Sequence, residues 1–307
     1  NWPGKTVARA EGGYSIGGQS YKLVDLPGTY SLLSTSYDEE IARDFILFGQ
    51  PDVTVIVVDA TRIERNLNLV LQVLEITDRA VVCLNLMDEA KRHGLAVDER
   101  RLAKDLGVPV VATSARFGEG LDLLNKTIAE VATGQIVCKP RRIKGQSLPL
   151  KSAVDSLAGT VSEGFPELPN ARWIALRLLD ADERIVEAVQ SGELENILAP
   201  KTAEDGTHMQ TAASRLNAPW DTTKSDKILA EASSLRWNIG ADFHQTLMET
   251  IYTESAHIAD RAVSRSGQEP KFDLDRTIDR LVTSRIFGFP IMVLALTVIL
   301  WLTISGA

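Results

Sequence analysis

Short apolar runs rich in β-branched residues alternate with helical patterns, and this alternation constrains the fold more than any other feature of the sequence. The apolar runs occupy residues 21–25, 53–59, 80–86 and 108–113. The helical patterns occupy residues 38–48, 63–76, 98–106 and 120–132. Continuous apolar runs of this length are typical of buried strands in a parallel sheet. The sequence therefore predicts an α/β doubly wound domain over residues 1–135.

The segments around this domain differ in character. A strand or hairpin at residues 6–11, followed by glycine pairs at 12–13 and 17–18, precedes the first apolar run. Residues 135–149 are polar and basic without periodicity, which predicts a solvated linker; contact of this basic run with anionic lipid is the alternative. From residue 150 to 267 apolar residues recur at helical spacing, mainly in 171–190 and 225–264. This stretch predicts a separate α-helical domain.

The last 22 residues, 286–307, carry no charge. A helix of that length spans roughly 30 Å, the thickness of the bilayer hydrocarbon. We therefore expect the start of a transmembrane domain here, with a buried core helix as the alternative. Arg276, Arg280 and Arg285 precede the span, so the positive-inside rule places residues 1–285 in the cytoplasm. Because proteins rarely stop inside a first span and the chain opens without Met, we expect truncation at both ends.

Composition excludes several classes of protein. The net charge of −8 argues against nucleic acid as a partner, since nucleic-acid-binding domains are usually basic. Cys83 and Cys138 lie far apart, and the four histidines are scattered. The sequence therefore predicts neither a disulfide framework nor an iron site within this chain.

Asp25-Leu26-Pro27-Gly28 follows directly on an apolar run. A carboxylate at the end of a strand can hold Mg²⁺ through water, and a glycine lets a backbone N–H approach a γ-phosphate. A plain turn after the strand is the alternative for this motif.

Asn85-Leu86-Met87-Asp88 closes another apolar run. A carboxylate here can accept hydrogen bonds from the N1–H and the exocyclic amine of guanine, which adenine cannot reproduce. The Asn amide can meet the N7 edge of the base and brace neighbouring loops. A helix N-cap at Asp88 is the competing interpretation.

Ser114-Ala115-Arg116 closes the following run, and its backbone N–H can reach the guanine O6 while the serine supports the loop. The three motifs stand at the carboxyl ends of successive predicted strands. Ligands of open α/β sheets bind along that edge. Together the motifs predict a guanine-nucleotide site.

The sequence resembles the ferrous iron transport protein B family, whose members are membrane proteins with an N-terminal GTPase domain. The segments that carry the resemblance are NWPGKTV, DLPGTYSL, SYDEEIARDF, NLMD, SAR, ARWIALRLLD and RLVTSRIFGFPIMV. They are spread over nearly the whole chain. The combination of NWPG with DLPGTYSL is far more specific than DxxG alone.

The resemblance implies further roles. Trp2, Pro3, Gly4, Lys5 and Thr6 match the first switch segment, where Thr6 completes the Mg²⁺ shell with Asp25. GTP and GDP are then the ligands, residues 150–267 affect nucleotide release, and Fe²⁺ is transported by a membrane region outside this chain. The whole protein is expected in a bacterial-type inner membrane, with small cytoplasmic partner proteins and a homo-oligomer as further partners.

Two departures from the family pattern affect the expected activity. Lys5 stands where the family usually carries an apolar residue. The chain contains no G-x-x-x-x-G-K-[ST], the loop that cradles the α- and β-phosphates, and the strand feeding that loop lies in the middle of such a sheet. We therefore expect a missing central strand, weak GTP binding and low stability of the chain alone.

The residues near the second switch predict slow hydrolysis. Thr29 follows Gly28 in place of the glutamine that orients water in faster GTPases. Glu39 and Glu40 could order a water but are more typical of a solvated helix start, so no catalytic residue is assigned. Three other functions stay open: a soluble translation or tRNA-modification GTPase, a membrane-tethered nucleotide sensor with little hydrolysis, and a transporter of the same family that carries another divalent metal.

Overall fold

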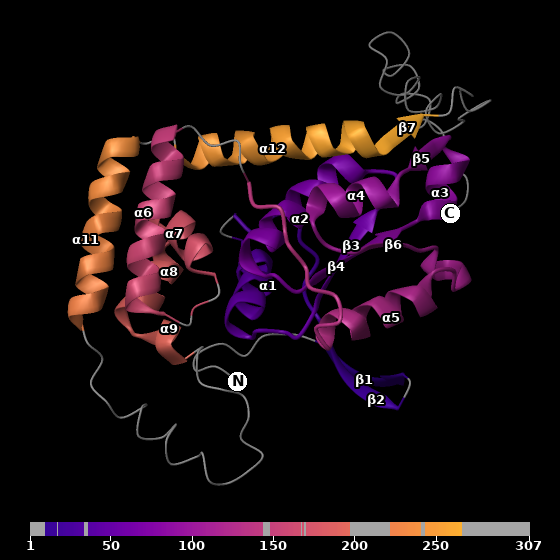
Figure 1. The fold of residues 1–307 in the computed structure, drawn as a ribbon, viewed down its shortest axis with the longest axis horizontal. Coiled ribbons are helices and arrows are strands. Elements are labelled where there is room, and N and C mark those ends of the chain that lie inside the picture. Colours follow the sequence, from indigo (N-terminus) through magenta and orange to yellow (C-terminus); the bar gives the residue numbers. More distant parts are fainter. Residues whose placement is uncertain are drawn as a thin grey trace, which may run out of the picture.

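The computed structural model describes residues 10–16, 18–33, 36–143, 148–166, 168, 170–196, 222–240 and 243–265 (Figure 1). The predicted first-switch residues Trp2, Pro3, Gly4, Lys5 and Thr6 lie outside this part of the chain. The apolar segment at residues 286–307 also lies outside it. Among the helices that the model describes, none is both long and apolar enough to cross a membrane.

A three-stranded parallel sheet forms the centre of the α/β part, as the alternating pattern predicts. Its strands are β3 (Thr54–Asp59), β4 (Ala80–Asn85) and β6 (Val110–Ala112), in the order β3-β4-β6. Helices α2 (Ile63–Ile76) and α4 (Glu99–Leu106) pack leucines against one face. Helix α5 (Leu121–Ala132) covers Val81, Cys83 and Val111 on the other.

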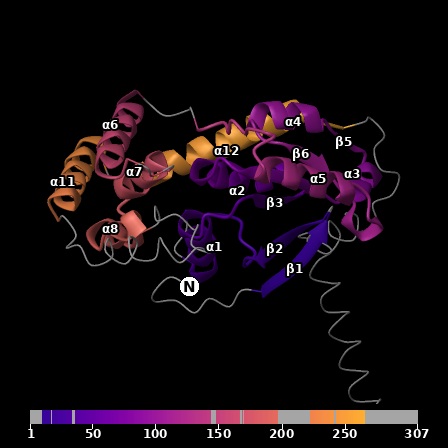
Figure 2. The same ribbon diagram turned by 60° about the horizontal axis from the view of Figure 1, so that its bottom comes forward.

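The predicted strand at residues 21–25 does not join this sheet, which corrects the sequence-based expectation. Strand β2 (Gln19–Asp25) pairs antiparallel with β1 (Ala10–Ile16) in a separate two-stranded sheet. The turn falls at Gly18, whose φ of 82° suits glycine. The other glycine pair, at residues 12–13, lies inside β1. Figure 2 shows this hairpin below β3 rather than beside β4 and β6.

Both sheets have a free edge within the described residues. Leu23 of β2 is 55% exposed, and Val57 of β3 is 61% exposed between two buried neighbours. A two-stranded hairpin with little buried apolar surface is marginal by itself. The exposed Val57 marks a sheet face that α5 covers only over β4 and β6.

The helices from residue 148 onward gather beside the α/β part, except that α12 runs across it (Figure 1). They are α6 (Leu148–Gly164), α7 (Ala171–Leu179), α8 (Glu183–Gln190), α9 (Glu193–Asn196), α11 (Thr222–Ile239) and α12 (Phe243–Ala262). The predicted helix at 171–190 is broken because Ala181 has a positive φ of 58° and Asp182 caps α8. Gly240, with φ of 92°, ends α11 before α12 begins.

One strand in the helical region is not predicted by the sequence. Strand β7 (Val263–Arg265) continues from α12 and pairs antiparallel with β5 (Leu95–Val97). This pairing joins the far end of the helical region to the α/β part, and α12 lies along α2 on the way there (Figure 1). Three-residue strands are too short to show a period, which explains why the sequence pattern does not reveal them.

A buried ionic network joins the helical region to α1 (Tyr37–Phe48), the helix after the DLPG segment. Arg43 Nη1 and Arg177 Nε each donate to Asp182 Oδ2 at 3.0 Å, and Arg184 Nε donates to Asp44 Oδ2 at 3.3 Å. Burial alone raises the pKa of Asp182, but the Arg177 and Arg43 guanidinium groups outweigh it and hold that pKa below its usual value. The ion pairs therefore tie α1 to the helices in one orientation.

Candidate functional site

The loop after β4 carries the predicted base-recognition motif. Strand β4 ends at Asn85, Leu86 takes a left-handed φ of 64°, and α3 (Met87–Arg92) begins at once. A left-handed leucine costs roughly 1–3 kcal/mol and persists only where its surroundings impose it. The strained residue turns the chain sharply at the strand end.

The loop after β6 is bonded directly to this turn. Asn85 Oδ1 accepts hydrogen bonds from Ala115 N at 3.0 Å and from Thr113 Oγ1 at 3.2 Å. Met87 N donates to Thr113 O at 3.2 Å. The structure thus brings the predicted Asn85 and Ser114-Ala115-Arg116 loops together, with the asparagine bracing the second loop as the sequence predicts. Thr113 completes the contact and is missed by sequence reasoning, because a strand-end threonine has no distinctive pattern.

A backbone hydrogen bond between the two ends of the second loop closes it. Ser114, which is buried, donates its N–H to Glu119 O at 3.1 Å. Residues Ala115–Phe117 form a 3₁₀ turn (η1) between them. At Gly120, with φ of 79°, an added Cβ would lie 2.2 Å from Ala112 O, so only glycine fits there.

Asp88 is the predicted selector of guanine. It stands in the first turn of α3, and the N-cap position is held by Leu86, so the N-cap interpretation of Asp88 is wrong. Its side chain is 25% exposed, and Asp88 Oδ2 lies 3.5 Å from the largely exposed Arg92. A partly exposed carboxylate beside such a weak partner keeps its acceptor sites open to a ligand.

We expect Asn85→Ala to unfold at a lower urea concentration than the parent chain. The change removes the acceptor of the Ala115 N–H and the nearer acceptor of the buried Thr113 hydroxyl, which keeps Leu84 O at 3.5 Å. Each lost hydrogen bond costs about 0.5–1.5 kcal/mol. Asn66→Ala on α2 is the matched control, because its amide caps only the Arg62 carbonyl at an exposed position. Equal losses in the two variants would show that the bracing hydrogen bonds contribute nothing special.

The DLPG segment leaves β2 at Asp25 and is held at its far end by α2. Asp25 and Gly28 are exposed, and an added Cβ at Gly28 meets no atom within 4 Å. Downstream, the buried Gln72 Oε1 accepts from Ser31 Oγ at 3.1 Å and from Leu32 N at 2.5 Å. The first part of the segment therefore faces open space, while its end is anchored. Sequence reasoning misses Gln72, because its amphipathic helix gives no sign of a buried amide.

The predicted Mg²⁺ site is only partly within the described residues. Asp25 is exposed, while its predicted partner Thr6 lies outside. In the part of the chain that the structure describes, no group of three or more His, Cys, Asp or Glu residues could hold a metal ion.

A parallel sheet with two hydrogen-bonded loops at its carboxyl edge defines the class: this is an open α/β fold of the kind that binds ligands along that edge. Residues 1–128 match the family model described as ferrous iron transport protein B. The chain is 31% identical over its whole length to the Fe(2+) transporter FeoB of Escherichia coli K12 and to that of Salmonella typhimurium. It covers 35% and 36% of those two proteins, so it spans about a third of their length.

Solved structures agree with the fold. The cytosolic domain of the T. maritima FeoB iron transporter, in a GDP form, is 28% identical with a TM-score of 0.61; the match covers 86% of this chain and 87% of that one. A point mutant of S. thermophilus NFeoB bound to GDP is 25% identical with a TM-score of 0.65, covering 86% and 89%. Residues 1–128 are therefore similar to the ferrous iron transport protein B family, and the likeness to FeoB proteins continues over the rest of the chain.

Proposed function

We propose that this chain is the GTP-binding, cytoplasmic part of a membrane transporter for ferrous iron. The observation that carries the proposal is the pairing of the two strand-end loops through Asn85 Oδ1, which places Asp88 and Ala115 at one edge of the sheet. The same edge holds nucleotide in folds of this class. Relatives solved with GDP and with GMPPNP support the choice of ligand.

The base-binding roles follow from the donors and acceptors at this edge. Asp88 accepts from the guanine N1–H and amine, Asn85 fixes the loops, and the N–H groups of the Ser114–Arg116 loop meet the O6. Adenine presents an acceptor at N1 and has no amine at C2, so it leaves the Asp88 carboxylate without its partners. Asp25 and Thr6 would hold Mg²⁺, and the Gly28 N–H would contact the γ-phosphate.

The phosphate-binding part requires a strand that the described residues do not contain. The free edges of β2 and β3, together with the exposed Val57 of β3, fit a strand that leads into a G-x-x-x-x-G-K-[ST] loop and its helix. We define the loop-completed chain as residues 1–307 preceded by a designed strand, loop and helix of this kind. In our proposal residues 1–135 form the GTPase domain, 150–267 a helical regulatory domain and 286–307 the start of the membrane domain.

We expect slow GTP hydrolysis by the loop-completed chain. Thr29 provides no amide to orient water, so turnover should stay on the order of 10⁻² s⁻¹ or below, the range of GTPases without an assisting protein. Phosphate release under saturating GTP and Mg²⁺ measures it, with the lysine of the added loop changed to alanine as the control. No release above that control would favour the alternative of a membrane-tethered nucleotide sensor.

Transport of Fe²⁺ is the further part of the proposal and rests on the relatives. The curated relatives are named Fe(2+) transporters, and this chain covers about a third of each. Iron is therefore a cargo of the longer protein, with its path in a membrane region beyond the described residues.

A further inference from the structure

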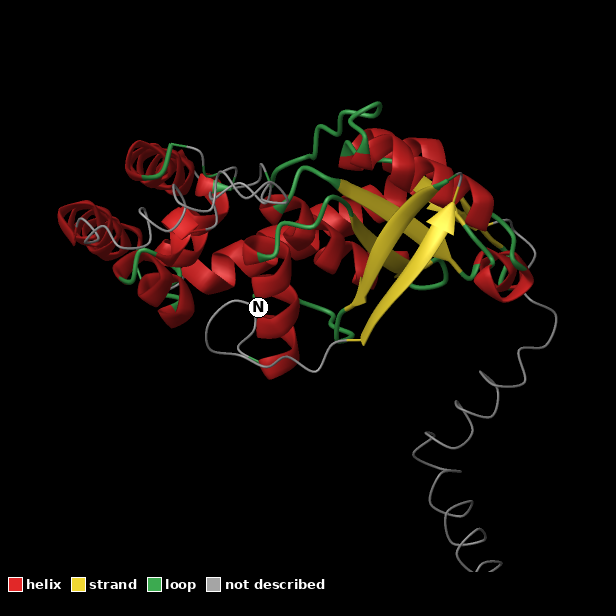
Figure 3. Cartoon of the chain, turned by 90° about the horizontal axis from the view of Figure 1, so that it is seen from below, coloured by secondary structure: helices red, strands yellow, loops and turns green. Residues whose placement is uncertain are grey.

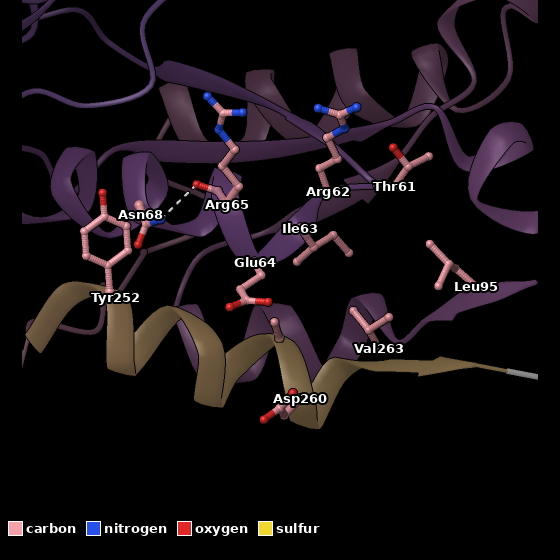
Figure 4. Close-up of a pocket in the computed structure, with 12 residues that line it drawn as sticks. Thr61, Arg62, Ile63, Glu64, Arg65, Asn68, Leu95, Tyr252, Asp260 and Val263 are labelled. Carbon is pink, nitrogen blue, oxygen red and sulfur yellow. Dashed lines mark hydrogen bonds between the residues drawn. The ribbon is translucent and has the colours of Figure 1, made fainter. Parts of the chain in front are cut away.

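A pocket of about 710 Å³ lies between α2 and α12, and none of the residues proposed to bind the base lines it (Figure 4). Its floor is apolar, with Ile63, Ala259 and Val263. Sites for small ligands and short peptides have volumes of roughly 300–1,000 Å³. None of the functions proposed for the base-recognition loops uses this space.

Asn68 is the group in this pocket that needs a partner. Its side chain lines the pocket yet the residue is only 7% exposed. Its Nδ2 donates to the Arg65 carbonyl at 3.1 Å, but its Oδ1 has no hydrogen-bond partner within the described residues. A buried acceptor without a donor is costly, so its presence at a pocket wall indicates a ligand N–H.

The charges around Asn68 are separated into two sides. Arg62 and Arg65 reach out from one side of the start of α2, where no side chain caps the helix. Glu64 and Asp260 lie on the other side, toward α12 (Figure 4). Arg62, Glu64 and Asp260 form no ion pair with one another or with other residues in the described ranges. The pocket is therefore neutral as a whole but strongly polarised.

We propose that this pocket binds a short peptide segment that carries one acidic and one basic residue. The acidic side chain meets the helix start with Arg62 and Arg65, a backbone N–H donates to Asn68 Oδ1, and the basic side chain meets Glu64 and Asp260. At 1.5 Å rise per residue, Asn68 lies roughly 7 Å along the helix from its first turn. That distance matches the separation between the side-chain carboxylate of one peptide residue and the backbone N–H of the next. The two acidic groups disfavour a polyphosphate in the same place.

Arg65 couples the pocket to the DLPG segment. Its guanidinium carbon lies 4.4 Å from the centre of the Tyr30 ring, so this arginine already has a cation–π partner. Tyr30 is 67% exposed and lies two residues beyond Gly28. A peptide carboxylate that draws Arg65 into the pocket weakens its contact with Tyr30. Peptide binding and the position of this segment are then linked in both directions.

The test uses the full chain in detergent, without nucleotide, and the blocked tripeptide acetyl-Asp-Gly-Lys-amide as the probe. Calorimetric titration should give saturable binding that Asn68→Leu weakens about tenfold or more, because the ligand N–H loses its acceptor. Asn66→Leu is the matched control, since Asn66 makes the same kind of bond to the Arg62 carbonyl but does not line the pocket. Tyr30→Ala should tighten binding about two- to fivefold, because Arg65 is released from the ring.

Three outcomes would overturn the proposal: no saturable binding, equal binding by the parent and Asn68→Leu, or full displacement of the probe by inorganic phosphate. The last would define a simple anion site instead. Because nucleotide is absent from the experiment, its result is independent of whether the chain binds GTP. Circular dichroism of each variant separates loss of the site from loss of folding.

Discussion

Asp88→Asn in the loop-completed chain should turn preference from guanine to xanthine nucleotides. The Asp88 carboxylate accepts from both the N1–H and the amine of guanine, and charge-assisted bonds contribute about 1.5–3 kcal/mol each. Losing this pair lowers GDP affinity roughly a hundredfold or more. Xanthine carries a carbonyl in place of the amine, so the Asn amide N–H matches it. Equilibrium titration with labelled GDP and xanthosine diphosphate measures both changes.

A neighbouring carboxylate on the same helix provides the control for this substitution. Glu89 is more exposed than Asp88 and pairs with the same Arg92 at 3.1 Å. Glu89→Gln removes the same charge from α3 without touching the proposed base contact. We expect its GDP affinity to stay within about twofold of the parent, as exposed ion pairs contribute little. Unchanged GDP affinity in Asp88→Asn would remove Asp88 from the base site.

The second large effect is the gain in nucleotide affinity when the sheet is completed. A phosphate loop adds several backbone N–H bonds and a lysine to the phosphates, each charge-assisted bond contributing about 1.5–3 kcal/mol. The loop-completed chain should therefore bind GDP at least a thousandfold more tightly than residues 1–307 alone. The added strand and helix also cover Val57 and the edge of β3, so the midpoint of urea unfolding should rise.

The GDP affinity of the chain without the added segment can contradict this prediction. Nanomolar-to-micromolar GDP affinity of residues 1–307 alone would show that phosphate binding needs no further loop. A control segment with its glycines and lysine replaced by serine keeps the strand and helix but removes the cradle. It should restore stability without restoring affinity, which separates the structural effect from the binding effect.

The sequence predicts the elements of the α/β part well because their periods are strong. The expected helix at 63–76 agrees with α2 as found, and the strand ends at Asn85 and near Ser114 fall where the motifs require. Asparagine at a strand end predicts a bracing role, and Asn85 accepts two hydrogen bonds there. These features are local, so a single sequence contains the information.

Features that depend on distant partners are not predicted. The run at 21–25 has the composition of a buried strand, yet β2 lies in a separate hairpin, since burial depends on a neighbour that composition does not show. The β5–β7 pairing and the Gln72 anchor join residues far apart in the chain. The sequence does not predict that Asn68 Oδ1 lacks a partner, because this depends on how α2 and α12 pack around the pocket.

The most direct test of guanine recognition is the ratio of ADP to GDP dissociation constants for the loop-completed chain, measured by competition against one labelled nucleotide. When adenine is bound, the Asp88 carboxylate and the N–H groups of the Ser114–Arg116 loop lose the hydrogen bonds that guanine makes, so we predict that ADP binds at least about a thousandfold more weakly. Equal affinities for ADP and GDP would mean that the paired loops after β4 and β6 do not read the base, and would contradict the proposed function.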